Sequence, residues 1–370
     1  MTEAYIAGLA TWVPKPYTTE RFIEIDREMR ARHGLEPGVS EMAASFARNT
    51  GIERRHSLHP AWHGQDPDGY PDIMTEADFD PELWQRHKFF HDHAERIAIE
   101  AARAAVADWG GDVADISHVI TTSTSGWKEP GLAYAVIHAL GLGQHTCKAE
   151  LNFNGCFCGA TCLRVARDTV RGGESGAVLV VAMESASTMF DFVDPKISTL
   201  LANALFGDGA AAVVVAPEGR WKFERAGASI VPETRDLLTF RPAIEPGRNS
   251  YDMFLHREVG KSLAHYLRER GGRKLLDTVF DLASGDLPAL AVHPGGPNIL
   301  EHVQAVFEQR GWPSDCLASS YATLHGYGNM GSAAVLFVLA NTLPTLAGDK
   351  LAMFAFGPGV TVEWGYYTRA

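Results

Sequence analysis

The sequence lacks a long apolar run, a leader-like N-terminus and a patterned set of cysteines. No apolar stretch approaches the roughly 20 residues that a membrane span needs. The N-terminal segment Met1–Ile6 has no basic region followed by an apolar one, so no signal peptide is predicted. Five cysteines without a CxxC pair argue against a disulfide framework or a zinc site. Together these absences predict a cytoplasmic protein with neither a membrane span nor a bound metal.

The chain also lacks a basic surface that could hold a nucleic acid. Its net charge is −12, and no long basic stripe offsets this excess of acidic residues. Hydrophobic residues make up 46% of the 370 residues and charged residues 21%, which is typical of a globular protein. That length is sufficient for a large core with two subdomains. We therefore expect a compact protein that acts on small molecules or on other proteins, without a nucleic-acid or membrane partner.

Strand-like and helix-like segments alternate along the chain. Strands are predicted at 5–14, 116–124, 177–183, 210–216, 221–230, 289–293, 350–356 and 360–366, with an extended run at 147–153, and those at 116–124, 177–183 and 210–216 are expected to be buried. Helices are predicted at 18–34, 40–50, 81–109, near 130–140, after Cys156, and at 257–270, 298–309 and 329–343. A turn is expected at Pro37-Gly38, and an irregular segment from His56 to Asp80. This alternation predicts an α/β fold with mostly parallel sheets, divided into halves at 1–218 and 219–370.

The stretch Asn152–Asp168 is the strongest functional candidate. It reads as a loop that delivers Cys156 to the first turn of a helix, with Gly155 and Gly159 allowing close backbone approach. A thiol at a helix start lies near unpaired N–H groups, which favour the thiolate. Cys156 is therefore a candidate acyl-accepting nucleophile, although most cysteines are simply small buried residues.

Two further polar residues lie far down the chain. His293 ends a predicted strand before Pro294-Gly-Gly296, where α/β folds open onto ligand crevices. It could act as a base or a hydrogen-bond donor, or be a core histidine bound to a carbonyl. Asn329 stands at the start of a predicted helix, where an N-cap is the ordinary role of asparagine.

Five motifs in order resemble the type III polyketide synthases, the chalcone-synthase-like branch of the thiolase-fold condensing enzymes. They are Gly155-Cys-Phe-x-Gly159, Ala204-Leu-Phe-Gly-Asp-Gly-Ala-Ala-Ala212, His293-Pro-Gly-Gly-Pro297, Gly328-Asn-Met330 and Phe356-Gly-Pro-Gly-Val-Thr-Val-Glu363. The resemblance implies two similar halves in a five-layer αβαβα body and a homodimer. It also implies thioester substrates, on coenzyme A or on a carrier-protein phosphopantetheine arm, with no cofactor.

The resemblance also implies roles for individual residues. Cys156 would hold the acyl chain, while His293 and Asn329 would assist loading, bind the malonyl thioester and stabilise the enolate after decarboxylation. His293 would also hold Cys156 as a thiolate through an ion pair. The implied cavity residues are the gatekeeper Phe206 with Thr124, Thr188, Glu184 and Pro358.

Several positions depart from the family pattern. Where the family has its second gatekeeper phenylalanine, this chain has Leu263. A cavity glycine of the family is replaced by Phe254 and a cavity serine by Gly331, so a reshaped cavity is expected. The methionine that reaches across the dimer in the family is replaced by Glu129.

The entrance positions that hold coenzyme A phosphates in the family also differ. They are Met42, Ser45 and Asn49, and only Arg48, Arg54 and Arg55 offer positive charge nearby. A carrier-bound donor, or replacement of the usual cations by these arginines, would each explain this loss.

The leading interpretation is an acyltransferase that carries out a decarboxylating Claisen condensation, with cyclisation to a pyrone or a resorcinol-type product. One alternative is a stand-alone ketosynthase that joins two carrier-bound β-ketoacyl chains into an α-pyrone. Another class is a Cys-His-Asn hydrolase, because the order Cys156, His293, Asn329 is also that of papain. A catalytically inactive scaffold is disfavoured because all three polar groups are retained.

Overall fold

The computed structural model describes residues 2–57, 83–173, 176–242, 251–279 and 287–370. The strands are β1 (Tyr5–Trp12), β2 (Pro16–Thr18), β3 (Arg54–His56), β4 (Ile116–Thr122), β5 (Cys147–Glu150), β6 (Ala177–Ser185), β7 (Asp208–Ala216), β8 (Trp221–Ile230), β9 (Leu238–Pro242), β10 (Tyr251–Leu255), β11 (Ala289–Val292), β12 (Lys350–Gly357) and β13 (Thr361–Arg369). The helices are α1 (Thr19–Arg32), α2 (Pro37–Asn49), α3 (Leu83–Trp109), α4 (Leu132–Leu140), α5 (Cys158–Arg171), α6 (Ile197–Leu205), α7 (Val259–Arg268), α8 (Arg270–Val279), α9 (Pro297–Glu308), α10 (Ala318–Tyr327) and α11 (Ala334–Thr342).

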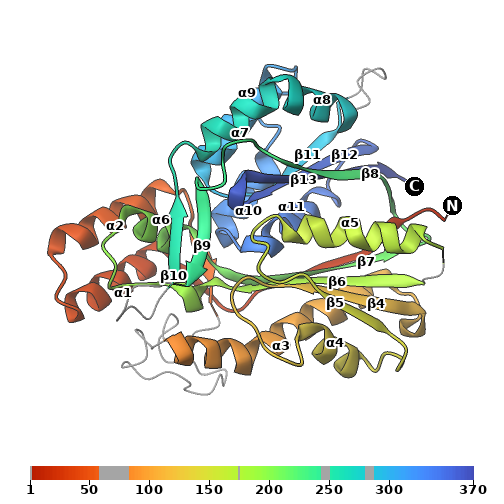
Figure 1. Cartoon of the computed structure of the whole chain (residues 1–370), viewed down its shortest axis with the longest axis horizontal. Coiled ribbons are helices and arrows are strands. Elements are labelled where there is room, and N and C mark those ends of the chain that lie inside the picture. Colours follow the sequence, from red (N-terminus) through yellow and green to blue (C-terminus); the bar gives the residue numbers. More distant parts are fainter. Residues whose placement is uncertain (1, 58–82, 174–175, 243–250, 280–286) are drawn as a thin grey trace.

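The largest sheet has the strand order β11-β12-β13-β8-β1-β7-β6-β4-β5. Only two residue pairs, Tyr5↔Lys222 and Ile6↔Trp221, join β1 to β8, so the sheet opens there into two layers. Helices α5 and α11 lie between these layers, α3 and α4 cover one outer face, and α7, α8 and α9 cover the other (Figure 1). This arrangement is a five-layer αβαβα body, as the sequence predicts.

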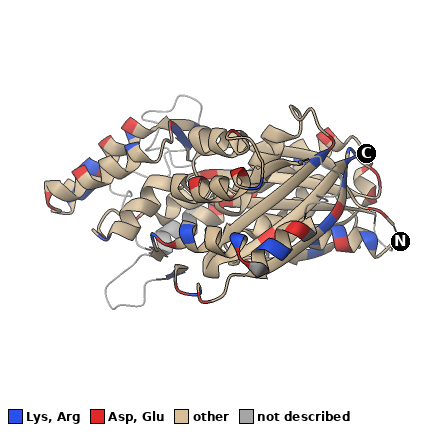
Figure 2. Ribbon diagram, turned by 90° about the horizontal axis from the view of Figure 1, so that it is seen from above, with Lys and Arg blue, Asp and Glu red and all other residues tan. Residues whose placement is uncertain are grey.

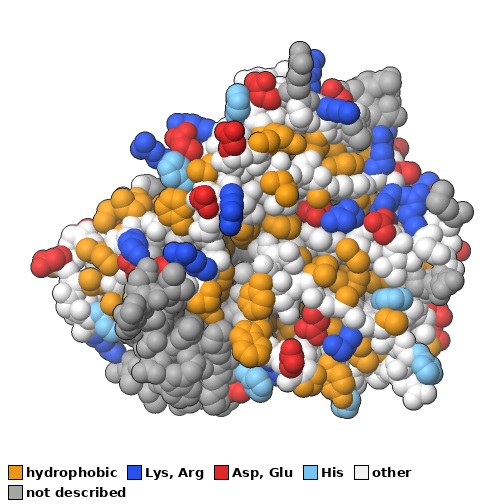
Figure 3. Space-filling model, viewed as in Figure 1, with side chains coloured by type: hydrophobic (Ala, Val, Ile, Leu, Met, Phe, Trp, Pro, Cys, Tyr) orange, Lys and Arg blue, Asp and Glu red, His pale blue; other side chains and the backbone are white. Residues whose placement is uncertain are grey.

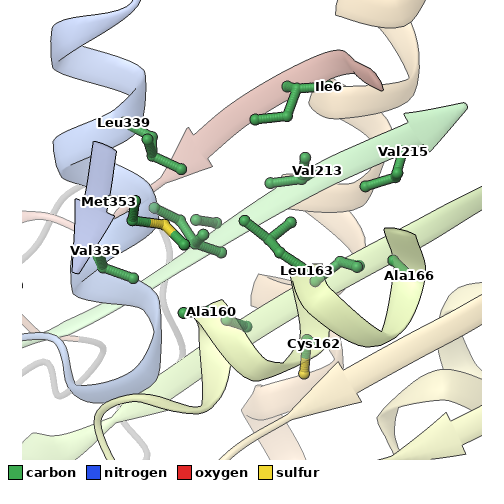
Figure 4. Packing of buried hydrophobic residues seen from close by; sticks show 14 of the residues in the cluster. Ile6, Ala160, Cys162, Leu163, Ala166, Val213, Val215, Val335, Leu339 and Met353 are labelled. Atoms are coloured by element: carbon green, nitrogen blue, oxygen red, sulfur yellow. The ribbon is translucent and has the colours of Figure 1, made fainter. Parts of the chain in front are cut away.

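The strands β6 and β7 are buried along their whole length because helices pack on both faces. Alternate side chains enter different cores: Val178 and Val180 face α5 and α11, whereas Leu179 and Val181 face α3 and α4. Figure 4 shows the central core, where Leu163 and Ala166 of α5 meet Val213 and Val215 of β7. The position of α5 is thus fixed from both sheet layers.

At one end of the body, α1, α2 and α6 form an extension with its own core around Phe22, Phe190 and Phe192, and the β9–β10 hairpin lies against α6. The buried Arg30 of α1 donates hydrogen bonds to the Asp26 carboxylate and to the carbonyls of Phe192 and Asp194. These bonds attach α1 to the segment that leads into α6. The extension supplies one wall of the candidate site described below.

Several predictions about local structure need correction. The expected turn at Pro37-Gly38 is instead the first turn of α2, because proline is well suited to the first helical position. The helix expected from Asn329 begins at Ala334, after a 3₁₀ turn at Gly331–Ala333. Helices α6, α8 and α10 and strands β2, β3, β9 and β10 were not predicted. From residue 58 on, the predicted irregular segment lies outside the described residues.

Charged side chains lie mostly on the helices and at the strand ends, and the strands that cross the middle of the body carry few (Figure 2). Among the described residues, no helix is both long and apolar enough to cross a membrane.

Candidate active site

Cys156 lies in a tight loop between β5 and α5. Gly155 has φ +87°, and a methyl group placed on it would lie 2.3 Å from Cδ of Pro358. A methyl group on Gly159 would lie 2.2 Å from the Ser332 carbonyl oxygen. The predicted close backbone approach at both glycines is therefore confirmed. Cys158 and Cys162 are fully buried in the core, which leaves Cys156 as the thiol of this loop that lines a cavity.

The electrostatics of Cys156 oppose the prediction of a stabilised thiolate. Helix α5 starts at Cys158, so Cys156 precedes the first turn rather than lying within it. Burial, reinforced by the negative charge of Glu184, raises the pKa of the Cys156 thiol to about 12. The expected lowering of this pKa is wrong for this geometry, because loss of hydration and the Glu184 charge outweigh the backbone hydrogen bond that lowers it. The group is therefore a neutral thiol at physiological pH.

His293 follows the last residue of β11, and its backbone N–H donates to the Phe354 carbonyl at 2.8 Å. The side chain is 2% exposed, and its Nδ1 has no hydrogen-bond partner within the described part of the chain. Burial lowers the pKa of His293 to about 3, so the imidazole is neutral at physiological pH. The predicted ion pair with a Cys156 thiolate is not favoured, since both groups are neutral.

Asn329 connects His293 to the gatekeeper segment. Its backbone N–H donates to the Leu205 carbonyl at 2.9 Å, and its own carbonyl accepts from Gly207 N–H at 3.1 Å. Its Nδ2 lies 3.4 Å from the carbonyl oxygen of Gly295, and a Cβ on that glycine would be 3.5 Å from Nε2 of His293. Asn329 is therefore not the N-cap of α11, which begins after Ala333, but an amide held beside the histidine loop.

A mostly apolar cavity brings together six of the residues predicted from the sequence. Its lining includes Cys156, Thr124, Glu184, Phe206, Gly331 and Pro358. The β9–β10 hairpin adds Phe240, Tyr251 and Met253, which the sequence analysis missed. The rings of Phe240 and Tyr251 stack with centroids 5.0 Å apart. Cys156 thus opens into this mostly apolar cavity.

Glu184 is the buried carboxylate of this cavity. It accepts hydrogen bonds from the backbone N–H groups of Thr124 at 3.0 Å and Ser125 at 3.1 Å, and from the Ser332 hydroxyl at 2.5 Å. Burial raises the pKa of Glu184, and these donors act in the opposite direction. Gly331 has φ +52°, and a Cβ there would lie 3.0 Å from Cγ of Glu184. Glycine at this position therefore makes room for the carboxylate.

A second hollow lies on the other side of the gatekeeper segment. This groove is lined by Leu205, Gly295, Gly296 and Pro297 together with residues of α2, α6 and α7. Leu205 faces the groove and Phe206 the cavity, and Asn329 pairs with this segment in an isolated β-bridge. His293 and Asn329 are not themselves among the described lining residues, but His293 lies two residues before Gly295 of the groove and Asn329 two residues before Gly331 of the cavity.

The comparisons with known proteins agree with this geometry. The family model for the N-terminal domain of chalcone and stilbene synthases matches residues 66–219, and that for the C-terminal domain matches residues 230–366. This chain belongs to the chalcone and stilbene synthase family. It is also 33% identical over 345 residues to bisdemethoxycurcumin synthase from Oryza sativa subsp. japonica, covering 86% of this chain and 80% of that protein.

Three solved type III polyketide synthases have a similar fold. The C-terminal domain of Steely1 from Dictyostelium has a TM-score of 0.85 at 20% identity, covering 99% of both chains. PKS-I from the brown alga Ectocarpus siliculosus gives 0.86 at 25% identity, covering 100% of this chain and 98% of that one. The 1,3,6,8-tetrahydroxynaphthalene synthase of Streptomyces coelicolor A3(2) gives 0.84 at 26% identity, covering 99% of both.

The predicted family and thiolase fold are thus confirmed. Type III polyketide synthases are acyltransferases that form C–C bonds, and they act on coenzyme A thioesters without a metal or other cofactor.

Three predicted cavity residues of this chalcone and stilbene synthase family member lie elsewhere. Phe254 is 45% exposed and lines the outer groove, because it faces the opposite side of β10 from Tyr251 and Met253. Leu263 is fully buried in the core beneath α7. Thr188 donates to the Ser185 carbonyl at 2.7 Å, while its neighbours Ala186 and Met189 line the cavity. The expectation that Phe254 is a cavity residue is therefore wrong.

Proposed function

We propose that this polyketide synthase carries its acyl intermediate on Cys156, and that His293 and Asn329 bind the thioester oxygen of a malonyl donor. The observation that carries the proposal is the boundary between two hollows. Cys156 lies on the cavity side, and the Gly295 loop, which holds His293 and Asn329 together, lies on the groove side. We infer that a thioester entering along the groove reaches the Gly295 loop before it reaches the thiol.

The chemistry follows from this order of contacts. Cys156 Sγ attacks the starter thioester and its proton leaves, with the neutral imidazole of His293 as the acceptor at hand. The C–S bond of the donor thioester breaks, and the departing sulfur takes the proton back from the imidazolium, so the free thiol leaves and His293 is neutral again. The malonyl thioester then loses CO2, and its enolate carbon attacks the carbonyl bound to Cys156. A new C–C bond forms and the cysteine sulfur is released.

Neutral donors suit the decarboxylation step. Negative charge develops on the thioester oxygen, and N–H groups of Asn329 and the uncharged His293 can donate to it. Both side chains are buried, at 3% and 2% exposure, so few waters compete for the enolate and each hydrogen bond is stronger than in solvent. A permanently charged imidazolium is not required for this role.

The first test is an intact-mass measurement after incubation with acyl-CoA. We expect an acyl adduct on the wild type that is absent from Cys156→Ala and retained in Cys147→Ala, whose cysteine is exposed on β5. An adduct that persists in Cys156→Ala would contradict the assignment of the nucleophile.

The second test separates the candidate reactions. Release of CO2 from malonyl-CoA, with extension of the bound chain, is the expected result. Product formed only with two loaded carrier proteins would favour the α-pyrone ketosynthase, and release of free acid without extension would favour hydrolysis. The mass of the released product reports whether it cyclises to a pyrone or a resorcinol-type ring.

We also propose a homodimer. Trp127, Tyr134 and Phe153 are 61%, 51% and 57% exposed, and they lie near one edge of the sheet, where Phe153 N–H donates to the Ser123 carbonyl at 3.1 Å. Large aromatic side chains clustered in solvent are typical of an interface. Glu129, the predicted cross-dimer position, lies in the same loop as Trp127. Elution at monomer mass in gel filtration would contradict this proposal.

A further inference from the structure

The outer groove has an unusual charge for this acidic protein. Two basic residues, Lys196 and Arg257, line it, and none of the described lining residues is acidic. The chain as a whole carries a net charge of −12. Figure 3 shows hydrophobic and basic side chains exposed near one another on the face where α6 and the β9–β10 hairpin lie. An apolar groove with basic residues at its wall fits a ligand that combines an apolar arm with an anionic end.

Three helices begin at this groove. Lys196 immediately precedes α6, Arg257 lies two residues before α7, and Pro297 is the first residue of α9, and all three line the groove. The N-terminal end of a helix carries partial positive charge and unpaired N–H groups. These three helix ends reinforce the two basic side chains, so an anion in this groove meets positive potential from several directions.

The two cations are available for a ligand. Nζ of Lys196 lies 3.8 Å from Asp194 and 3.9 Å from Asp252, and its side chain is 58% exposed. Nε of Arg257 lies 3.8 Å from Glu258, and its side chain is 90% exposed. Long, solvated ion pairs of this kind contribute little to stability. Both side chains can therefore turn towards a phosphate at small cost.

The arginines expected to replace the missing cations of α2 do not serve this groove. Arg48 forms two hydrogen bonds with the Glu20 carboxylate, at 3.0 and 2.9 Å, and is not among the described lining residues. Arg55 is fully buried and donates to the Ala204 carbonyl and to Thr19. Of Met42, Ser45 and Asn49, only Asn49 borders the groove. The positive charge of this groove thus comes from residues next to α6 and α7 and not from α2.

We propose that Lys196 and Arg257 bind the phosphates of a coenzyme A thioester, with its pantetheine arm lying along the groove towards Gly295. The inference rests on the proposed function, because the groove lining includes Gly295, which follows His293 by two residues and whose carbonyl oxygen lies 3.4 Å from Nδ2 of Asn329. Coenzyme A is the occupant that fits, since it offers several phosphate groups to two cations and three helix ends. The phosphate site is then on the α6–α7 side rather than on α2.

The test compares two donors that carry the same acyl group. One is an acyl-CoA, and the other is the acyl thioester of N-acetylcysteamine, which lacks phosphate. In the double variant Lys196→Ala/Arg257→Ala we expect the KM for acyl-CoA to rise about tenfold, with kcat nearly unchanged. The KM for the N-acetylcysteamine thioester should stay the same. Added salt should raise the wild-type KM for acyl-CoA more than that of the double variant.

A matched control is Lys261→Ala, which removes an exposed cation from α7 outside the groove lining. A rise in KM for acyl-CoA no larger than in this control would overturn the proposal, as would an equal rise for the phosphate-free donor. A wild type that accepts only carrier-bound acyl groups would overturn coenzyme A as the occupant. If the phosphate-free donor fails to acylate Cys156 in the wild type, the proposed function itself is refuted.

Discussion

The contact between Gly155 and Pro358 offers a sharp test of how the nucleophile is positioned. Gly155 has φ +87°, and because it lacks a Cβ, its backbone can lie directly beside the proline ring. In Gly155→Ala, the new methyl group would lie 2.3 Å from Cδ and 2.6 Å from Cγ of Pro358. The substitution therefore imposes two separate costs, one in the backbone and one in packing.

The magnitude of each cost can be worked out. A left-handed backbone costs an alanine about 1–2 kcal/mol. Ordinary carbon contacts begin at 3.4 Å, so the proline ring must move by about 3.4 − 2.3 = 1.1 Å, and such overpacking costs about 1–3 kcal/mol. We expect the free energy of unfolding to fall by about 2–5 kcal/mol. Because Cys156 is the next residue, acylation should also slow.

Gly34→Ala is the matched control. Its φ is +70° and a methyl group there would meet nothing within 4 Å, so only the backbone cost of about 1–2 kcal/mol applies. Urea unfolding monitored by circular dichroism measures both variants. The double variant Gly155→Ala/Pro358→Ala should recover at least about 1 kcal/mol relative to the sum of the single changes. If Gly155→Ala loses no more stability than Gly34→Ala, the packing argument is refuted.

Four other outcomes are expected. Because the pKa of Cys156 is raised to about 12, its alkylation by iodoacetamide should accelerate about tenfold per pH unit from about pH 7 to pH 10, and a plateau below pH 8 would contradict this. Glu184→Gln removes the negative charge that contributes to this raised pKa, so alkylation at a fixed pH should become faster in an intact-mass time course. Arg164→Ala removes the ion-pair partner of the buried Glu363 carboxylate at 2.8 Å and leaves it the hydrogen bond from the Thr161 hydroxyl, so the free energy of unfolding should fall by about 2–3 kcal/mol, against about 0.5 kcal/mol or less for the exposed pair in Arg103→Ala. Phe240→Ala removes one ring of the stacked pair in the cavity wall, so the product mass spectrum should shift towards longer chains, and an unchanged spectrum would argue against this wall as a limit.

The catalytic candidates could be predicted from the sequence because their local motifs are tied to backbone requirements. Gly155 and Gly159 flank Cys156 where neighbouring segments leave no room for a Cβ, and His293 directly follows a strand. Such constraints can be recognised in a single sequence. That Cys156, His293 and Asn329 act in one site, by contrast, was inferred from the family resemblance and not from their spacing.

The cavity wall was harder to predict because it depends on strand register. Met253 and Phe254 are neighbours on β10, and their side chains point to opposite sides, one to the cavity and one to the groove. An alignment that is uncertain by one residue therefore reverses the assignment. The pKa of Cys156 was also missed, because burial and the approach of Glu184 are tertiary effects that its helix-start position does not reveal.

The close packing of Gly159 on the Ser332 carbonyl has a consequence for building hybrid enzymes. Gly159 belongs to the helix that follows the nucleophile, whereas Ser332 comes three residues after Asn329 and holds Glu184. The two halves thus share one point of steric registration beside the reaction centre. A chimera of two synthases should stay active only where both parents have glycine at position 159 and the same backbone path at position 332. Any mismatch would displace the Cys156 sulfur relative to the Asn329 amide.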